Sequence, residues 1–290
     1  MGKMTMSSEH QSGLLLVNSL TKYFGGVTAV QAVCLEVHTA EIVGVIGANG
    51  AGKTTLFDLI SGFIRPDRGS MQLRRPDGTL VDLARCPAKQ RAYLGIGRTF
   101  QNARLFGSLS VLDNLRVVQH SLMKRGFWAS LLGMGAPEEE DVLDRAYEAM
   151  TLVGLEGHMD KPVQELSYGM LRLCELACVV ALRPRLLLLD EPTSGMAEKE
   201  VEALVPLLLE LQKRLQASVL IIEHDVPFIM EISDRLVAMA SGQVISEGLP
   251  DEVVSDPDVI ESYLGSSWQS RVSPLAVGGD AGSAHGAANA

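Results

Sequence analysis

The segment 47–54, with the sequence GANGAGKT, has residue types and a spacing that bind phosphate, because it fits the pattern G-x-x-x-x-G-K-[ST]. Its glycines permit a tight turn whose backbone N–H groups face phosphate oxygens at the positive end of the following helix. Lys53 adds a charge for the β- and γ-phosphates, and the Thr54 hydroxyl is a ligand for Mg²⁺. A chance glycine-rich turn is the weaker explanation, because an apolar strand precedes the segment and a helix follows it. The expected cofactor-binding residues here are Gly47, Asn49, Gly50, Ala51, Gly52, Lys53, Thr54 and Thr55.

An acidic pair, Asp190-Glu191, directly follows the apolar run 186–189. The carboxyl end of a buried strand lies at the ligand-binding edge of an α/β sheet. Asp190 is placed there to organise Mg²⁺ and its waters, and Glu191 to orient or deprotonate an attacking water. An ordinary helix cap would use the same residue types, but the phosphate-binding segment favours the chemical role. The two motifs together predict a hydrolase, although the first alone also suits a kinase, a GTPase or an ATPase.

The elements that must carry these motifs follow from the pattern of apolar residues. Uninterrupted apolar runs predict buried parallel strands at 41–46, 186–189, 219–222 and 236–239. Helical periodicity predicts helices at 53–61, 111–123, 138–153, 171–182 and 198–216. Turn residues and short apolar runs predict further strands at 14–17, 34–37 and 70–73, with turns at 25–26, 66–69 and 76–78. This alternation of strands and helices is typical of an α/β fold.

The charge balance narrows the classes of partner. The chain has 290 residues, with 25 basic and 35 acidic side chains and a net charge of −10. Nucleic acid is therefore not expected as a partner, because most of the affinity for it comes from neutralising phosphates. No apolar run approaches the roughly 20 residues of a membrane-spanning helix. We therefore expect that the chain does not cross a membrane by itself. It can still dock on proteins that do cross one.

The pentapeptide LSYGM at 166–170 resembles the signature of ABC-type ATPases, whose usual form is LSGGQ. The first, second and fourth positions match, whereas Tyr168 and Met170 depart from it. The pentapeptide stands about 20 residues before Asp190, in the order typical of that family. A P-loop kinase of another family would leave it unexplained.

Other motifs of the same family follow in the expected order. Gln101, in the sequence RTFQ, matches the glutamine loop, and His224 matches the switch histidine. Residues 192–197 occupy the position of the dimer loop. An aromatic residue before the Gly25-Gly26 turn should stack on adenine, and the spacing favours Phe24 over Tyr23. Each of these residues alone has an ordinary structural explanation, so their joint order carries the resemblance.

The resemblance implies an ATPase in which two such domains close head to tail on two ATP molecules. Ser167 and Gly169 would contact the γ-phosphate of the ATP bound by the other subunit, at a helix terminus suited to anions. It also implies that Gln101 contributes to Mg²⁺ binding and to catalysis, and that His224 is catalytic.

Two departures from the family pattern change what is expected. Met170 cannot hydrogen-bond as glutamine does, so weaker signature contacts are expected. Ala197 stands where the dimer loop usually carries Asp or Asn. Signalling between the subunits through a polar side chain at this position is therefore not expected. A non-catalytic regulatory subunit is an alternative on these grounds. Because Glu191 and His224 are both present, hydrolysis is still expected.

The resemblance covers residues 14–265 and implies the fold class and its parts. This is an α/β fold, a P-loop NTPase core of the ABC ATPase type with a mainly parallel sheet, an antiparallel β subdomain and a helical subdomain at about 102–178. Residues 1–13 are expected to form a flexible leader, and the Ala- and Gly-rich residues 266–290 a disordered tail.

The segment 95–106 resembles the glutamine-loop region of branched-chain amino-acid importers, and most of all the first of their two ATP-binding subunits. Tyr168 in the signature and the stretch 257–265 suit the same group. The lipopolysaccharide-export ATPase has a similar C-terminal stretch but a different glutamine-loop region. The expected function is ATP-driven uptake of branched-chain or related amino acids. The alternatives are an importer of urea or another small polar organic solute and, disfavoured by the acidic charge, a soluble ABC ATPase acting on DNA or ribosomes.

The resemblance also implies the partners. They are a second ABC ATPase subunit, expected to be a paralogue, two transmembrane permease subunits and an extracytoplasmic solute-binding protein. The chain itself would be a peripheral protein on the cytoplasmic face of the inner membrane. The apolar segment 127–133 would either line the groove that receives short helices of the permeases or pack within its own subdomain. The transported molecule is not encoded in this chain, because its pocket would lie on other subunits.

Overall fold

The computed structural model describes residues 13–100, 105–121 and 136–264. Gln101, the segment 127–133, the leader up to residue 12 and the tail 266–290 lie outside the described residues. Within these three stretches, no helix is both long enough and apolar enough to span a lipid bilayer.

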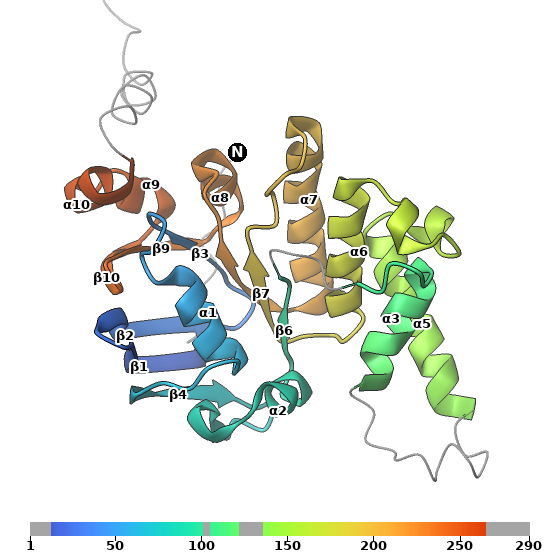
Figure 1. The fold of residues 1–290 in the computed structure, drawn as a ribbon, viewed down its shortest axis with the longest axis horizontal. Helices are drawn as coiled ribbons and strands as arrows, with labels where there is room; N and C mark the ends of the chain where they lie inside the picture. The colour runs from blue at the N-terminus through green and yellow to red at the C-terminus, as the bar shows by residue number, and fades with distance from the viewer. Residues whose placement is uncertain (1–12, 101–104, 122–135, 265–290) are drawn as a thin grey trace, which may run out of the picture.

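A six-stranded sheet in the order β10-β9-β3-β8-β7-β6 forms the centre of the molecule (Figure 1). All its neighbouring strands are parallel except β10, which pairs antiparallel with β9. The strands are β3 (Ile42–Ile46), β6 (Ile96–Arg98), β7 (Leu186–Asp190), β8 (Ser218–Ile222), β9 (Arg235–Ala240) and β10 (Gln243–Gly248). The four strands predicted from uninterrupted apolar runs are confirmed, with β3, β7 and β8 buried along their whole length. Because β3, β7 and β8 are parallel, the segments that follow them leave the sheet at one edge.

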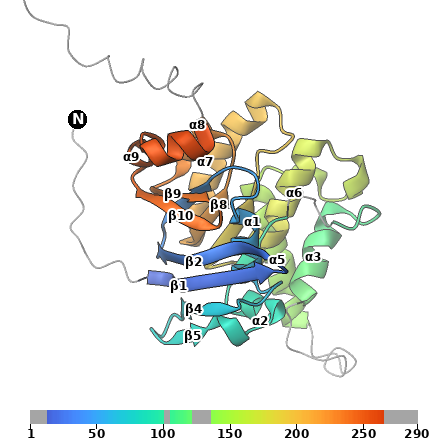
Figure 2. The ribbon, with the colours of Figure 1, turned by 60° about the vertical axis from the view of Figure 1, so that its left-hand side comes forward.

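A second sheet is antiparallel, with the strand order β2-β1-β4-β5. Its strands are β1 (Gly13–Phe24), β2 (Val27–His38), β4 (Arg68–Arg74) and β5 (Leu80–Asp82). Figure 2 shows β1, β2, β4 and β5 side by side on one flank of the molecule. The Gly25 turn is confirmed, but β1 and β2 are each 12 residues long, far longer than the strands predicted. Register shifts between β1 and β2 break the alternation of apolar residues, which hid their full length from the sequence pattern.

The predicted helix 53–61 is confirmed with the same bounds, and the other predicted helices are present with some ends shifted by up to three residues. Several short helices were not predicted from the periodicity. The long helices are α1 (Lys53–Ser61), α3 (Val111–Ser121), α5 (Ala136–Leu152), α6 (Tyr168–Val180) and α7 (Glu198–Leu215). The short ones are α2 (Ala88–Tyr93), α8 (Val226–Ile232), α9 (Pro250–Val254) and α10 (Pro257–Val259). Helix α6 begins three residues earlier than predicted, because Ser167 caps its N-terminus.

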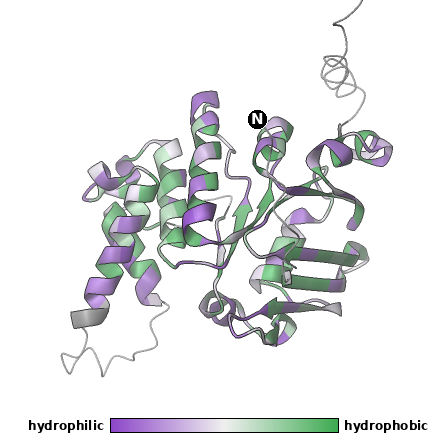
Figure 3. Ribbon diagram, turned by 180° about the vertical axis from the view of Figure 1, so that it is seen from behind, coloured by the Kyte–Doolittle hydropathy of each residue, from purple (hydrophilic) through white to green (hydrophobic). Residues whose placement is uncertain are grey.

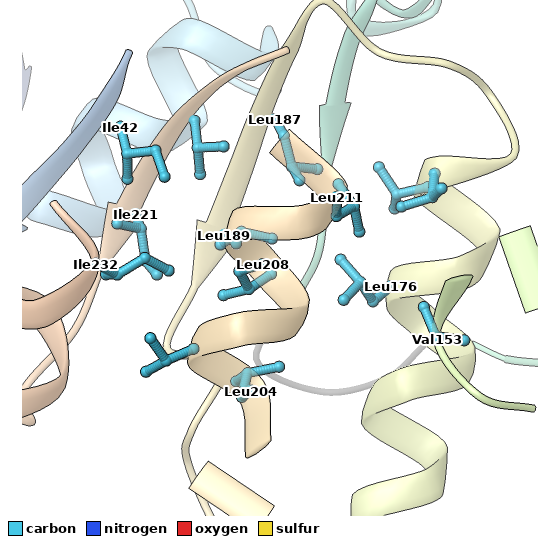
Figure 4. Packing of buried hydrophobic residues seen from close by; sticks show 14 of the residues in the cluster. Ile42, Val153, Leu176, Leu187, Leu189, Leu204, Leu208, Leu211, Ile221 and Ile232 are labelled. Carbon is cyan, nitrogen blue, oxygen red and sulfur yellow. The ribbon is translucent and has the colours of Figure 1, made fainter. Parts of the chain in front are cut away.

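Two hydrophobic clusters lie on the two faces of the six-stranded sheet, because successive side chains of a strand point to opposite faces. Leu187 and Leu189 of β7 face α6 and α7, where Leu176, Leu204 and Leu208 pack against them (Figure 4). The neighbouring side chains of β7 face the other cluster, which contains residues of α1 and of the antiparallel sheet. Figure 3 shows hydrophobic and hydrophilic residues alternating along the helices, as expected for helices with one buried side. Helices α1 and α6 therefore lie on opposite faces of the sheet.

Candidate active site

The phosphate-binding segment joins the end of β3 to the start of α1 at the edge where the parallel strands end. Gly52 caps α1 in a left-handed conformation with φ +101°, and a Cβ there would lie 2.4 Å from the carbonyl oxygen of Ala29. A Cβ at Gly47 would lie 2.2 Å from the carbonyl oxygen of Met239. Both positions therefore require glycine, and the loop has the backbone course that a phosphate cradle needs.

Lys53 points into this loop. Its side chain is only 5% exposed, and Nζ donates hydrogen bonds to the carbonyl oxygens of Gly47 (2.6 Å) and Ala48 (3.0 Å). Burial lowers the pKa of the ammonium group, and the carboxylates of Glu191 and Asp190 oppose that shift. The loop thus holds a positive charge where the sequence predicted phosphate, and Thr54 and Thr55 follow on the first turn of α1.

Asp190 ends β7 and is 5% exposed. Its Oδ2 accepts a hydrogen bond from Nη2 of Arg98 at 3.0 Å, while Nη1 of the same arginine donates to Asp58 (2.6 Å) and Ser61 (2.9 Å) of α1. Burial raises the pKa of the Asp190 carboxyl, and Arg98 counteracts this. Arg98 therefore joins the helix of the phosphate loop to the acidic strand end. Sequence reasoning missed this role, because an isolated arginine at the end of a short strand does not indicate partners 40 and 92 residues away.

Glu191 and His224 meet at the same edge, because β7 and β8 are parallel neighbours. His224 Nε2 lies 2.7 Å from Glu191 Oε1. Glu191 adopts a left-handed conformation with φ +50°, and its N–H donates to the carbonyl oxygen of Ile222 at 2.9 Å. This backbone bond and the histidine fix the carboxylate that the sequence predicted as the base.

A second carboxylate that the sequence analysis did not single out, Glu223, is 2% exposed. Its Oε1 accepts hydrogen bonds from the N–H (2.8 Å) and the hydroxyl (2.6 Å) of Thr193, and its Oε2 accepts from the N–H of His224 (2.8 Å). Glu223 therefore fastens the predicted dimer loop to the loop of the predicted switch histidine. The signal was available, since Glu223 follows an apolar strand in the same way as Asp190 and Glu191.

The signature residues lie at the start of α6, the helix on the opposite face of the sheet from α1. The Ser167 hydroxyl accepts from the N–H of Met170 at 3.3 Å. A Cβ at Gly169 would lie 2.3 Å from Oε1 of Glu200, whose other carboxylate oxygen accepts from the N–H of Ala197 at 2.9 Å. Within one chain, Gly169 thus lies against Glu200 at the start of α7, while Ser167 caps its own helix, and neither has a described contact with the phosphate loop.

Phe24 and Tyr23 end β1, and both rings are exposed, at 49% and 40%. Lys22 Nζ lies 5.5 Å from the centroid of the Phe24 ring. Both rings are partly exposed, and the preference for Phe24 stays a prediction. Gln101, predicted for Mg²⁺ binding and catalysis, lies outside the described residues.

A glycine loop between a buried strand and a helix, beside acidic residues at the end of another parallel strand, defines a P-loop nucleotide hydrolase. Residues 30–194 match the ABC transporter family, and residues 243–268 match the family described as branched-chain amino acid ATP-binding cassette transporter. The chain therefore belongs to the ABC transporter family, and is one of its ATPases, with the fold class inferred from the sequence. The resemblance noted from its motifs is confirmed.

Relatives and solved structures support the same assignment. The chain is 40% identical over 254 residues to LivG of Escherichia coli, described as a high-affinity branched-chain amino acid transport ATP-binding protein, and the match covers 87% of this chain and 98% of the relative. It is 37% identical, with the same coverage, to the protein of the same description named BraF in Pseudomonas aeruginosa. The ADP conformation of MJ1267, an ATP-binding cassette of an ABC transporter, superposes with a TM-score of 0.75 at 30% identity over 88% of this chain and 99% of that one. A nucleotide-free cassette from an ABC transporter gives the same TM-score at 28% identity, covering 88% of this chain and all of that one.

Proposed function

We propose that this chain is the ATP-hydrolysing subunit of an importer of branched-chain or related amino acids. The substrate class is inferred from the relatives named above, which this chain matches over nearly their whole length. The observation that carries the catalytic part is the contact between Glu191 and His224 at the sheet edge that also holds Lys53.

The proposed reaction assigns each group a task. Backbone N–H groups of the loop 47–52 and the Lys53 ammonium bind the β- and γ-phosphates. Glu191 accepts a proton from the attacking water or orients it, and His224 holds that carboxylate in place. Phe24 stacks on the adenine, and Ser167 and Gly169 bind the γ-phosphate held by the partner ATPase.

The residues present also fit Mg²⁺, which prefers hard oxygen ligands. Thr54 offers an exposed hydroxyl on the first turn of α1, and Asp190 offers a carboxylate at the end of β7. Gln101 would complete the set. Mg²⁺, when bound, neutralises charge on the phosphates.

ATP drives a movement only if its affinity differs between two states of the subunits. ATP bound between the phosphate loop of one ATPase and the signature of another favours the closed pair, and hydrolysis at Glu191 removes that preference. The position of Ser167 and Gly169 away from their own phosphate loop supports this arrangement. The second ATPase is proposed to be a paralogue.

A groove of about 470 Å³ supports a permease partner. It lies between residues of α1, α2 and β6 on one side and residues of α3 and α6 on the other. Its walls are mainly apolar, contributed by Phe63, Ala92, Phe100, Leu105, Val118, Val179 and Leu182. We propose that it receives a short helix of a transmembrane permease, in which case the chain would lie on the cytoplasmic face of the membrane. A solute-binding protein would deliver the substrate on the other side.

The test is to tag the chain in its native cell, solubilise the membranes gently and identify the co-purifying proteins. Two permeases, a second ATPase and a solute-binding protein are the expected result. Titration of that binding protein with leucine, isoleucine, valine and urea then identifies the substrate class. Recovery from the soluble fraction without a permease would contradict transport.

A further inference from the structure

Tyr168 replaces a glycine of the usual signature and makes contacts that a glycine could not make. Its hydroxyl accepts a hydrogen bond from Nη2 of Arg172 at 2.9 Å, and the Arg172 guanidinium lies 5.2 Å from the centre of its ring. The ring also lies against Gly195, where a Cβ would stand 2.7 Å from Tyr168 Cε1. The signature is therefore tied both to the next turn of α6 and to the predicted dimer loop.

Arg172 connects Tyr168 to a buried carboxylate, Glu175. Its Nη1 lies 3.2 Å from Oε2 of Glu175, and each of the two side chains is 8% exposed. The two charges hold one backbone residue between them, since Glu175 Oε1 accepts from the N–H of Phe100 (2.6 Å) and Arg172 Nη1 donates to its carbonyl oxygen (3.0 Å). Burial raises the pKa of Glu175, and the Phe100 N–H and Arg172 oppose that shift by stabilising the anion. A buried ion pair of this kind is well satisfied only while Phe100 stays in place.

The far end of this series of contacts lies in the groove. Phe100 and Glu175 both line it, whereas Tyr168 lies at the signature. A segment that enters the groove therefore contacts Phe100, which the Arg172–Glu175 pair holds, and Glu175 itself.

We propose that Tyr168, Arg172 and Glu175 form a positioning chain that transmits the occupancy of the groove to the signature, so that a docked permease segment controls how Ser167 and Gly169 meet the nucleotide of the partner ATPase. This inference rests on the proposed function, in which the groove receives a permease segment. The three residues act through others and do not touch the reacting atoms. A purely structural ion pair would explain Arg172 and Glu175, but it would not need the hydroxyl of the half-exposed Tyr168.

The test compares the ATPase rate of the complex purified from native membranes with that of the free full-length chain. The ratio of the two rates is measured for Tyr168→Phe, for Glu175→Gln and for the double variant. Each single change should lower the ratio by about tenfold, the effect of losing a charge-assisted hydrogen bond. The double variant should fall no further than the worse single one, because both changes interrupt the same chain.

Tyr147→Phe is the matched control, because Tyr147 is a tyrosine of similar exposure on the neighbouring α5, and it should keep the wild-type ratio. Losses that multiply in the double variant would overturn the positioning chain, and so would equal losses in the complex and the free chain. If Glu175→Gln does not fold, Tyr168→Phe decides alone, and an unchanged ratio overturns the inference. Failure of the wild-type chain to co-purify with permeases would instead overturn the proposed function and the inference together.

Discussion

Nε2 of His224 lies 2.7 Å from Oε1 of Glu191, although 33 residues separate them along the chain. Two parallel strands bring them together, because β7 and β8 end at the same sheet edge. The contact gives the carboxylate one defined orientation beside the phosphate loop.

Replacing Glu191 by Gln should leave ATP binding intact and slow hydrolysis by about 10²–10⁴-fold, the usual contribution of a general base. The amide keeps the shape of the side chain but accepts no proton. Equilibrium binding of a fluorescent ATP analogue and steady-state phosphate release measure the two quantities separately. Wild-type turnover in this variant would remove Glu191 from the mechanism.

Lys53→Ala should weaken nucleotide binding roughly ten- to hundredfold, because it removes charge-assisted hydrogen bonds to phosphate. The change should also abolish measurable ATPase activity. Lys213→Ala serves as the control, since Lys213 lies in the exposed last turn of α7, and it should behave as the wild type. Unaltered affinity of the Lys53 variant in isothermal titration would contradict the proposed phosphate site.

Arg98→Gln should lower the free energy of unfolding by about 3–5 kcal/mol, because Asp190 would stay buried without its charged partner. Arg183→Gln removes an ion pair of similar length, 2.6 Å to Glu148, but both of those side chains are more than half exposed. The control should therefore cost less than about 1 kcal/mol. Urea unfolding followed by circular dichroism measures both, and equal small losses would show that the Arg98 pair contributes little.

Tyr263 provides a test at alkaline pH. Burial, aided by Glu223, Asp225 and Glu191, raises its pKa from 10.0 to about 12. The folded state thus retains a proton that the unfolded state loses, so this contribution to stability is fully present below pH 10.0 and disappears as the pH rises through about 12. Urea unfolding between pH 8 and pH 11.5, values spanning the ordinary tyrosine pKa, should show a decline for the wild type that is smaller in Tyr263→Phe. Parallel curves for the two proteins would contradict the shift.

The sequence was sufficient for features that contiguous residues determine. The phosphate loop, the strand before it and the acidic strand end are each set by a short run, and the structure places them as predicted. Arg98 was missed because its partners Asp58 and Asp190 are distant in the chain. Glu223 was missed although it follows an apolar strand as Asp190 and Glu191 do, a pattern that could have indicated it. Strand β6 was missed because it has only three residues, and the sequence IGR gives no usable period. The lengths of β1 and β2 were underestimated because bulges interrupt their pattern.

The carboxylate of Glu200 occupies the space that a side chain at Gly169 would need. Glu200 can swing aside, but it then loses its bond to the N–H of Ala197, at a cost of about 1 kcal/mol for a lost helix cap. The effect of a substitution at position 169 therefore depends on the residue at position 200. A substitution at residue 169 costs less once position 200 carries a shorter side chain, so the order of the two changes matters. A single-site scan of the signature would attribute to nucleotide contact a loss that arises in part at the start of α7.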